Sequence, residues 1–171
     1  LSRVEASERM RPTQKVDLKY VVSESIEALG PLIEKSDLKL LLEISVNPSQ
    51  VMGEYDQLRQ VFMNLLENAI KYGKNAGVIK ICLSEPYHEP KLRKVVLSLS
   101  VKDEGPGIDP IHIPWLTERF YRVDTHRSRE MGGTGLGLAI VKHIMNRHRG
   151  RLVINSSVGT GTEVKLLLPI V

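Results

Sequence analysis

Cysteine is almost absent from this chain of 171 residues, in which Cys82 is the only one. A single cysteine excludes an internal disulfide bond. Because Cys82 lies in the apolar run 78–83, we expect a buried thiol and a reducing compartment. Zinc chemistry is also disfavoured, since His143 and His148 would lie about 140° apart around a helix and no second cysteine can complete a site.

Long apolar runs are absent as well, because none approaches the roughly 20 residues that a membrane-spanning helix needs. The sequence begins at Leu1 with neither an initiator methionine nor a charged and then apolar leader, so we expect a piece of a longer protein. With 42% hydrophobic and 26% charged residues, the composition is that of a globular chain with one full-sized core. We expect one main domain at 16–171, preceded at 1–15 by a linker or the end of a truncated helix.

The excess of positive charge is small, at +4. Three arginines lie near the end of a helical pattern, where cations complement the helix dipole: Arg147, Arg149 and Arg151. Four others lie in a segment without periodicity: Arg119, Arg122, Arg127 and Arg129. A solvated loop is the default for such a segment, and the alternative is a set of arginines that closes over phosphate. This distribution does not favour a nucleic-acid partner.

Hydrophobic periodicity predicts helices and strands in alternation. The expected helices are 18–35, 55–72, a short one at 113–119, and 137–148. The expected strands are 39–46, 50–53, 78–83, 95–101, 152–155 and 163–168. We expect 78–83 and 95–101 to pair as an antiparallel hairpin around the loop 84–91, and the last two strands to close the sheet as a pair. The order predicts an α+β fold, a two-layer sandwich of a mixed, mostly antiparallel sheet with helices on one face.

The helix at 55–72 carries a polar stripe of two amides, an acid and a lysine. Asn64, Glu67, Asn68 and Lys71 fall within an arc of roughly 100°. One interpretation is a solvated face with an ion pair between Glu67 and Lys71. The other is a binding face, because asparagine is a poor helix former, an amide oxygen can bind Mg²⁺, and a lysine one turn away can contact phosphate.

Two glycine-containing segments follow. In the segment 103–108, which comes after a strand, glycines let the backbone approach a ligand and Asp103 can accept a hydrogen bond from an exocyclic amine such as that of adenine. The segment 132–137 leads into a helix whose free amides suit a phosphate chain. The alternative for the segment 103–108 is an ordinary turn, and the alternative for the segment 132–137 is a flexible hinge. Two known phosphate-binding patterns do not fit. The P-loop pattern fails because Lys142 lies between Val141 and His143, and the dinucleotide pattern fails because Leu138 stands where a third glycine or alanine would be needed.

Four ordered segments resemble the N, G1, F and G2 boxes of the sensor histidine kinase catalytic domain: 64–72, 103–108, 118–122 and 133–138. The resemblance covers 16–171 and implies the ATP-binding fold shared with DNA gyrase, the Hsp90 chaperones and MutL-type mismatch-repair proteins. Residues 1–12 resemble the end of the second helix of the dimerisation hairpin. The run 1–5 with 16–18 is similar to the phosphate-regulon type of sensor.

The resemblance implies roles for the residues of these boxes. Asn68 coordinates Mg²⁺, Asn64 and Lys71 contact the phosphate side, and Tyr72 lies beside the adenine or ribose. Asp103 reads the adenine amino group, and Thr162 supports it through water. Three residues shape the base pocket: Gly105, Gly107 and Ile108. Five residues meet the phosphates with the lid: Gly133, Thr134, Gly135, Leu136 and Gly137. The γ-phosphate arginine is Arg122, which joins Asn64 and Lys71 as an expected catalytic residue.

The resemblance also implies the reaction. Hydrolases of this wider fold place a glutamate one turn before the metal-binding asparagine, where this chain has Asn64, and an amide cannot act as a base. We therefore expect transfer of the γ-phosphoryl group of ATP to a histidine, with Glu67 left as a group that could support slow hydrolysis. A hydrolase of the same fold and a non-enzymatic docking domain are the alternatives. Mitochondrial kinases of this fold match Phe120, Tyr121 and Arg122 less well.

The acceptor histidine is not evident in this chain. The nearest local match to the acceptor box is His88, in a loop with prolines on both sides, so we expect the acceptor on a hairpin before Leu1 and no self-labelling by this fragment. The expected partners are the protein's own dimerisation domain, in a homodimer, and the receiver domain of a response regulator. The fragment would be monomeric or weakly associated, and would come from the cytoplasmic part of a bacterial sensor anchored in the inner membrane through regions outside it.

Overall fold

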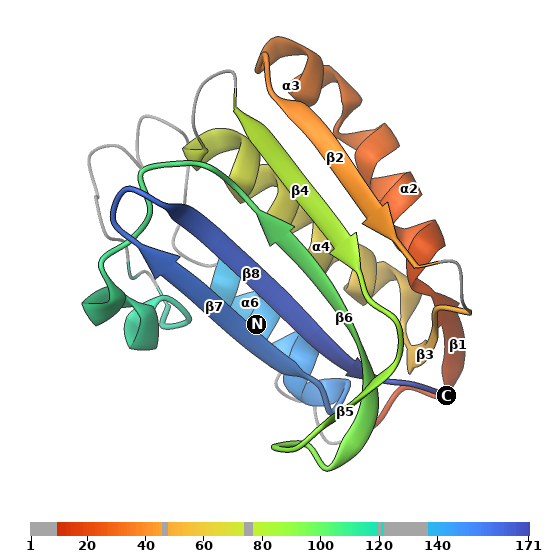
Figure 1. Cartoon of the computed structure of the whole chain (residues 1–171). Coiled ribbons are helices and arrows are strands. Elements are labelled where there is room, and N and C mark those ends of the chain that lie inside the picture. Colours follow the sequence, from red (N-terminus) through yellow and green to blue (C-terminus); the bar gives the residue numbers. More distant parts are fainter. Residues whose placement is uncertain (1–9, 46–47, 74–76, 120, 122–136) are drawn as a thin grey trace.

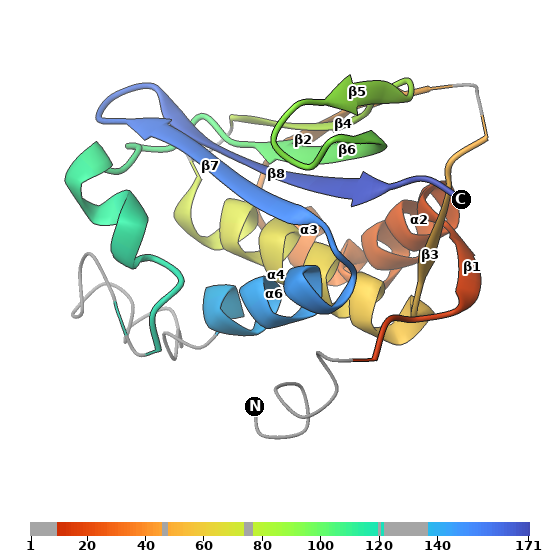
Figure 2. The same cartoon turned by 90° about the horizontal axis from the view of Figure 1, so that it is seen from below.

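The structure is a computed structural model and describes residues 10–45, 48–73, 77–119, 121 and 137–171. One layer is a sheet and the other consists of helices that cover one of its faces (Figures 1 and 2). The helices are α2 (Leu18–Ala28), α3 (Gly30–Lys35), α4 (Tyr55–Tyr72) and α6 (Gly137–Arg147), with the 3-10 helix η1 (Pro110–Trp115). The strands are β1 (Gln14–Asp17), β2 (Lys39–Ile44), β3 (Gln50–Gly53), β4 (Val78–Leu83), β5 (Tyr87–Glu89), β6 (Lys94–Lys102), β7 (Arg151–Ser157) and β8 (Gly161–Pro169).

The main sheet has the strand order β2-β4-β6-β8-β7, and β5 pairs with β6 beside this path. Strand β2 runs parallel to β4, whereas the pairs β4–β6, β6–β8 and β7–β8 are antiparallel. The prediction of a mixed, mostly antiparallel sheet is therefore confirmed, as are the hairpin of β4 with β6 and the closing pair of β7 with β8.

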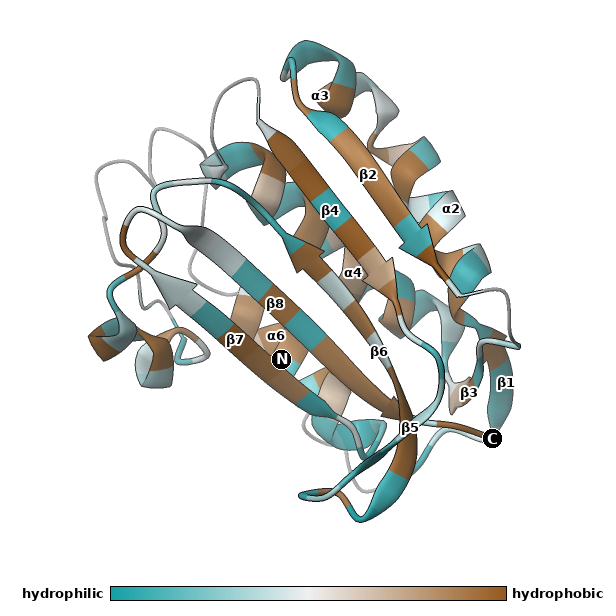
Figure 3. Cartoon of the chain, in the orientation of Figure 1, coloured by the Kyte–Doolittle hydropathy of each residue, from teal (hydrophilic) through white to brown (hydrophobic). Residues whose placement is uncertain are grey.

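The core lies between the sheet and the helices. Side chains alternate between the two faces of a strand, so that Ile79, Ile81 and Leu83 of β4 are buried under the helices. Hydrophilic and hydrophobic bands alternate along the first part of β8, and the strand then ends in an apolar stretch with Leu166, Leu167 and Leu168 all buried (Figure 3). Helix α4 packs its apolar side into this core, and Phe62 and Leu66 have no exposed surface. This packing fixes which side of α4 remains for polar residues.

The first predicted helix, 18–35, is divided in two. Helix α2 ends at Ala28, and α3 starts at Gly30 with Pro31 in its first turn. Proline has no backbone N–H and clashes with the preceding turn, so it can begin a helix but does not continue one. The third predicted helix is also shifted, because η1 occupies 110–115 and the expected element was at 113–119.

Two short strands lie where no strand was predicted. Strand β1 lies at the boundary of the expected linker 1–15 and pairs antiparallel with β3, and its Asp17 accepts a hydrogen bond of 2.9 Å from the N–H of Lys19 to cap α2. Strand β5 lies in the expected loop 84–91. The expected helix end before residue 10 lies outside the described residues.

Cys82 is a further correction, because its side chain is only half-buried. Its neighbours Ile81 and Leu83 face the helices, and alternation along β4 therefore turns Cys82 to the opposite face of the sheet. Within the described ranges, no helix combines the length and the apolar character that crossing a membrane requires.

Candidate nucleotide-binding site

Segments that are far apart in the sequence meet at one end of the molecule. Figures 1 and 2 both show the last turn of α4, the end of β6, η1, the turn between β7 and β8, and the first turn of α6 gathered at this end. Because α4 and α6 run in opposite directions there, a helix C-terminus lies beside a helix N-terminus. The first N–H groups of an α-helix have no partner within the helix, and such groups favour a bound anion.

The polar stripe of α4 lies on the side of the helix that the core leaves uncovered. Asn64, Glu67, Asn68 and Lys71 are all half-buried, whereas Leu65, Leu66 and Ala69, which lie between them in the sequence, are buried. Lys71 Nζ lies 3.5 Å from Glu67 Oε1, so the ion pair expected on a solvated face is present. A partly exposed pair of this kind contributes little stability, about 0.3 to 0.5 kcal/mol. The pair leaves both amide side chains of the stripe outside it.

Asp103 follows directly after β6 and is held in place by backbone groups. Its own N–H donates to the carbonyl of Thr162 at 2.9 Å. Its Oδ1 accepts from the N–H of Gly105 at 2.8 Å and from the N–H of Thr162 at 3.3 Å. Among the residues that the structure describes, Oδ2 has no hydrogen-bond partner. The carboxylate therefore offers one oxygen to a donor from outside the fold.

Burial raises the pKa of Asp103 above its ordinary value, and the two backbone hydrogen bonds oppose that shift. The cause is desolvation, since the carboxyl group is partly withdrawn from water against the end of α4. A ligand that donates a hydrogen bond to Oδ2 would compensate this loss of solvation.

The first glycine segment packs against the polar stripe's helix. A Cβ on Gly105 would lie 2.6 Å from the carbonyl oxygen of Tyr72, a distance that no side chain tolerates. A Cβ on Gly73, the residue after α4, would lie 3.6 Å from Cβ of Asp103. The fold therefore brings the predicted N and G1 boxes, which are about thirty residues apart in the sequence, into direct contact.

The rest of this segment is attached to the turn between β7 and β8. The N–H of Ile108 donates to Ser156 Oγ at 2.8 Å, and the N–H of Gly159 donates to the carbonyl of Pro106 at 2.7 Å. Gly107 has a φ of +72°, the left-handed region that favours glycine. Ser156 was missed in the sequence analysis. It lies on the face of β7 that carries Leu152 and Ile154, and a polar residue in that position of an apolar face was the available signal.

Several predicted site residues lie outside the described residues: Arg122, Gly133, Thr134, Gly135 and Leu136, together with Arg127 and Arg129. Gly137 begins α6 at the site end of the molecule. Tyr121, the described residue beside this gap, has its hydroxyl 2.5 Å from His112 Nδ1 on η1.

A divalent cation at this site would need ligands from the nucleotide. In the described part of the chain, no group of three or more histidine, cysteine, aspartate and glutamate residues is placed to hold a metal. Asn68 is half-buried on the stripe, and its amide oxygen is a neutral hard ligand of the kind that Mg²⁺ accepts alongside phosphate oxygens and water. Asn68 therefore suits an ion whose other ligands are the oxygens of a bound polyphosphate and water.

Comparison with known proteins agrees with this geometry. Residues 53–171 match the family described as histidine kinase-, DNA gyrase B- and HSP90-like ATPase. The phosphate regulon sensor protein PhoR of Pseudomonas aeruginosa is 48% identical over 116 residues, which cover 66% of this chain and 24% of that protein. The sensor-like histidine kinase SenX3 of Mycobacterium tuberculosis is 34% identical over 169 residues, which cover 99% of this chain and 39% of that protein.

Among solved structures, the mycobacterial sensor histidine kinase MprB matches with a TM-score of 0.76 and 28% identity over 92% of this chain and 97% of that one. The catalytic domain of the histidine kinase ThkA has the same fold, with a TM-score of 0.75. The chain thus spans well under half the length of the two sensor proteins named above. It belongs to the histidine kinase-, DNA gyrase B- and HSP90-like ATPase family, as an ATP-binding domain of the sensor histidine kinase kind.

Proposed function

We propose that this domain binds Mg²⁺-ATP at the end of α4 and presents the γ-phosphate to a histidine on the dimerisation domain of its own protein. A receiver domain of a response regulator would then take the phosphoryl group. The observation that carries the proposal is Asp103, a half-buried carboxylate with Oδ1 fixed by two backbone N–H groups and Oδ2 left for a donor. Adenine carries such a donor in its exocyclic amine.

The phosphate side of the site is assigned to the polar stripe. Asn68 would bind the ion, which supplies neutralisation of phosphate charge when bound, and Lys71 lies one turn after Asn68 on the same face. The first turn of α6 supplies free N–H groups at the same end of the molecule. Arg122 is assigned to the γ-phosphate from the resemblance of its segment to the F box.

The residue types of the polar stripe favour transfer of the phosphoryl group over hydrolysis of ATP. Asn64 occupies the place where a base would activate water, and its amide does not take up a proton. Phosphoryl transfer needs alignment and charge neutralisation, both of which amides, a lysine and helix N–H groups provide.

His88 is a poor acceptor in this geometry. It pairs with Val95 near the start of β6, whereas Asp103 follows the far end of that strand. At about 3.3 Å per residue, the two positions lie roughly 25 Å apart along the strand. The distance supports the assignment of the acceptor to the dimerisation domain rather than to His88.

The test is calorimetric titration of the domain with ATP, with and without Mg²⁺, and with Asn68→Ala beside the native chain. Binding in the micromolar range that strengthens with Mg²⁺, and a loss of that Mg²⁺ effect in Asn68→Ala, would support the proposal. Gln60→Ala, an exposed residue two turns earlier on α4, serves as the control and is expected to bind as the native chain does.

Three results would contradict the proposal. A folded domain that binds no ATP would favour a docking role. Steady release of phosphate by the isolated domain would favour a hydrolase. Labelling of His88 by ATP in the isolated domain would place the acceptor inside this chain.

A further inference from the structure

Ser156 of β7 makes three hydrogen bonds through one hydroxyl group. Its Oγ accepts from the N–H of Ile108 at 2.8 Å, lies 2.9 Å from the carbonyl oxygen of Gly161, and lies 2.8 Å from Thr162 Oγ1. A hydroxyl has one proton to donate, and the carbonyl of Gly161 can only accept. The Ser156 proton therefore goes to Gly161, and Thr162 donates its own hydroxyl proton to Ser156.

This arrangement connects three segments of the site. Ile108 ends the glycine segment that follows Asp103, and Gly161 and Thr162 begin β8. Gly161 has a φ of +90°, and a Cβ there would lie 2.1 Å from the carbonyl oxygen of Asp103. The backbone of β8 thus touches the backbone of Asp103 at the residue that Ser156 holds.

The position of the Asp103 carboxylate depends on the same residues. Thr162 exchanges two hydrogen bonds with Asp103, giving its N–H to Oδ1 at 3.3 Å and accepting the N–H of Asp103 at 2.9 Å. Ser156 holds the side chain of Thr162 from the other side. It touches neither oxygen of the carboxylate, so any effect of Ser156 on a ligand must pass through Thr162 or through the glycine segment.

We propose that Ser156 is a positioning residue for base selection: its hydroxyl fixes Thr162 and Ile108, and through them it aims Oδ2 of Asp103 at the exocyclic amine of adenine. This inference rests on the proposed function, in which Asp103 reads that amine. It assigns the preference for a 6-amino purine to a serine that contacts no part of the nucleotide. A 6-oxo purine, as in inosine triphosphate, would present an acceptor to the same carboxylate oxygen.

The test compares ATP with inosine triphosphate in the native chain, in Ser156→Ala and in Ser157→Ala. Ser157 is the matched control because it is the next residue, its side chain is exposed, and its hydroxyl bonds only within the turn, to Thr160. Ser156→Ala is expected to weaken ATP binding about tenfold and to leave inosine triphosphate binding nearly unchanged, so that the preference for ATP falls about tenfold. Ser157→Ala is expected to keep the native preference.

A second readout measures the hydrogen bond between Ile108 and Ser156 directly. Hydrogen exchange of the Ile108 amide is expected to accelerate in Ser156→Ala and to stay slow in Ser157→Ala, because only the first change removes the acceptor of that N–H. Should Ser156→Ala fail to fold, Thr162→Val removes the hydroxyl on the other side of the same link and keeps the backbone N–H that Asp103 accepts. It is expected to lower the preference for ATP as well.

The proposal is overturned if Ser156→Ala weakens both nucleotides equally, which is the result of a purely structural role. It is also overturned if Thr162→Val keeps the native preference. Failure of the native chain to bind ATP at all would instead overturn the proposed function, and the two failures are therefore distinguishable.

Discussion

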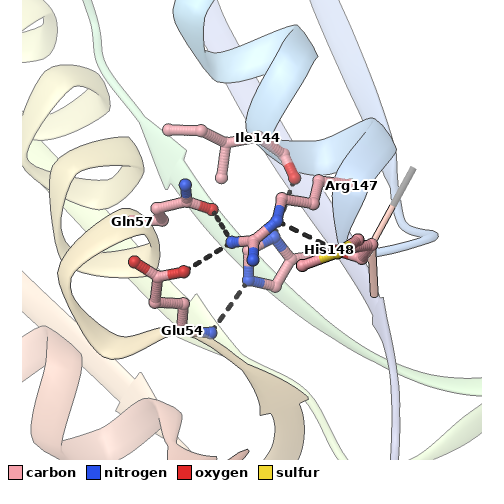
Figure 4. A network of polar contacts seen from close by, with 6 residues as sticks. Glu54, Gln57, Ile144, Arg147 and His148 are labelled. Carbon is pink, nitrogen blue, oxygen red and sulfur yellow. Dashed lines mark hydrogen bonds and ion pairs between the residues drawn. The ribbon is translucent and has the colours of Figure 1, made fainter. Parts of the chain in front are cut away.

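The buried imidazole of His148 accepts a hydrogen bond from the backbone N–H of Glu54, with 3.1 Å between Nε2 and that nitrogen (Figure 4). Its other ring nitrogen, Nδ1, lies 2.8 Å from the carbonyl oxygen of Ile144. A carbonyl only accepts, so Nδ1 carries the proton and Nε2 carries the lone pair. This neutral tautomer is the one that joins the end of α6 to the start of α4.

Arg147 reinforces the same connection. Its guanidinium donates to Glu54 Oε2 at 2.5 Å, to Gln57 Oε1 at 2.7 Å and to the carbonyl oxygen of Met10 at 3.1 Å. The network therefore links α6, α4 and the chain that enters β1, at the end of the molecule away from Asp103 (Figures 1 and 4). It sets the relative position of α4 and α6, the two helices to which we assign the phosphate side of the proposed site.

The first prediction concerns the pH dependence of stability. Burial lowers the pKa of His148 below its ordinary value of 6.5, and the neighbouring Arg147 acts in the same direction. As the pH falls below about 6.5, the unfolded chain takes up a proton that the folded chain refuses, so the free energy of unfolding decreases. The slope is at most about 1.4 kcal/mol per pH unit for one proton. Urea unfolding at several pH values between about 5 and 8 measures it.

Two variants check the assignment to His148. His148→Gln is expected to lower stability at neutral pH and to flatten this dependence. His88→Gln, which changes an exposed histidine of β5, is expected to retain it. The pH series ends near 5 because Asp103 has the opposite effect in more acidic solution. Its pKa is raised in the folded chain, so the folded chain takes up that proton more readily than the unfolded chain and the free energy of unfolding increases. An equal flattening in both variants would assign the effect to another group.

The sequence predicted the elements with strong periodicity and missed contacts that only the fold creates. Helix 55–72 and its stripe were predicted with the bounds that α4 has, because eighteen residues of amphipathic pattern outweigh local exceptions. Strand β1 was missed because only Val16 of its four residues is buried, so no alternation is visible. The break after Ala28 was missed although Pro31 is a strong local signal.

The supports of the site were beyond sequence reasoning for a physical reason. Ser156 and Ile108 are 48 residues apart, and Arg147 and Glu54 are 93 residues apart. Such pairs form only after the sheet register is set, and no local pattern encodes them. Asp103 was selected as a candidate because it follows a strand and precedes glycines, whereas the one local signal for Ser156 is its polar side chain on the apolar face of β7.

The second prediction uses two glycines of the turn between β7 and β8. Gly161 and Gly159 both have positive φ, +90° and +86°, but only Gly161 lies against Asp103. Gly159→Ala is expected to cost about 1 kcal/mol from the backbone conformation alone. Gly161→Ala is expected to cost about 3 kcal/mol or more and to abolish ATP binding, because its Cβ would displace the backbone of Asp103. Thermal unfolding and calorimetry measure both, and equal losses would contradict the contact.

The third prediction concerns Asp103 itself. Asp103→Asn keeps an oxygen for Gly105 and Thr162 but places an NH₂ group where Oδ2 was, and two donors then face each other when adenine binds. ATP affinity is expected to fall by about 30-fold and that of inosine triphosphate to rise. Asp109→Asn is the control, because Asp109 also accepts a backbone N–H, from Ile111, but only caps η1. An unchanged ATP affinity in Asp103→Asn would remove Asp103 from base recognition.

The fourth prediction separates the phosphate side from the base side. Lys71→Met removes the ammonium of the stripe, and Glu67 is left without its partner at a position where water can solvate it. ATP affinity is expected to fall about tenfold, since a charge close to a phosphate is lost, and adenosine affinity is expected to stay the same. Lys80→Met provides the control: Lys80 also pairs with a glutamate, Glu43 at 3.1 Å, but on the opposite face of the sheet.

The comparison of ATP with adenosine decides what the stripe does. If Lys71→Met weakened both ligands equally, Lys71 would support the shape of α4 rather than contact phosphate. If it weakened neither, the stripe would be the solvated face that its ion pair also permits. A loss confined to ATP requires a phosphate close to Lys71, and since Asn68 lies on the same face within one turn, the ion that accompanies the phosphates would then lie within reach of its amide oxygen.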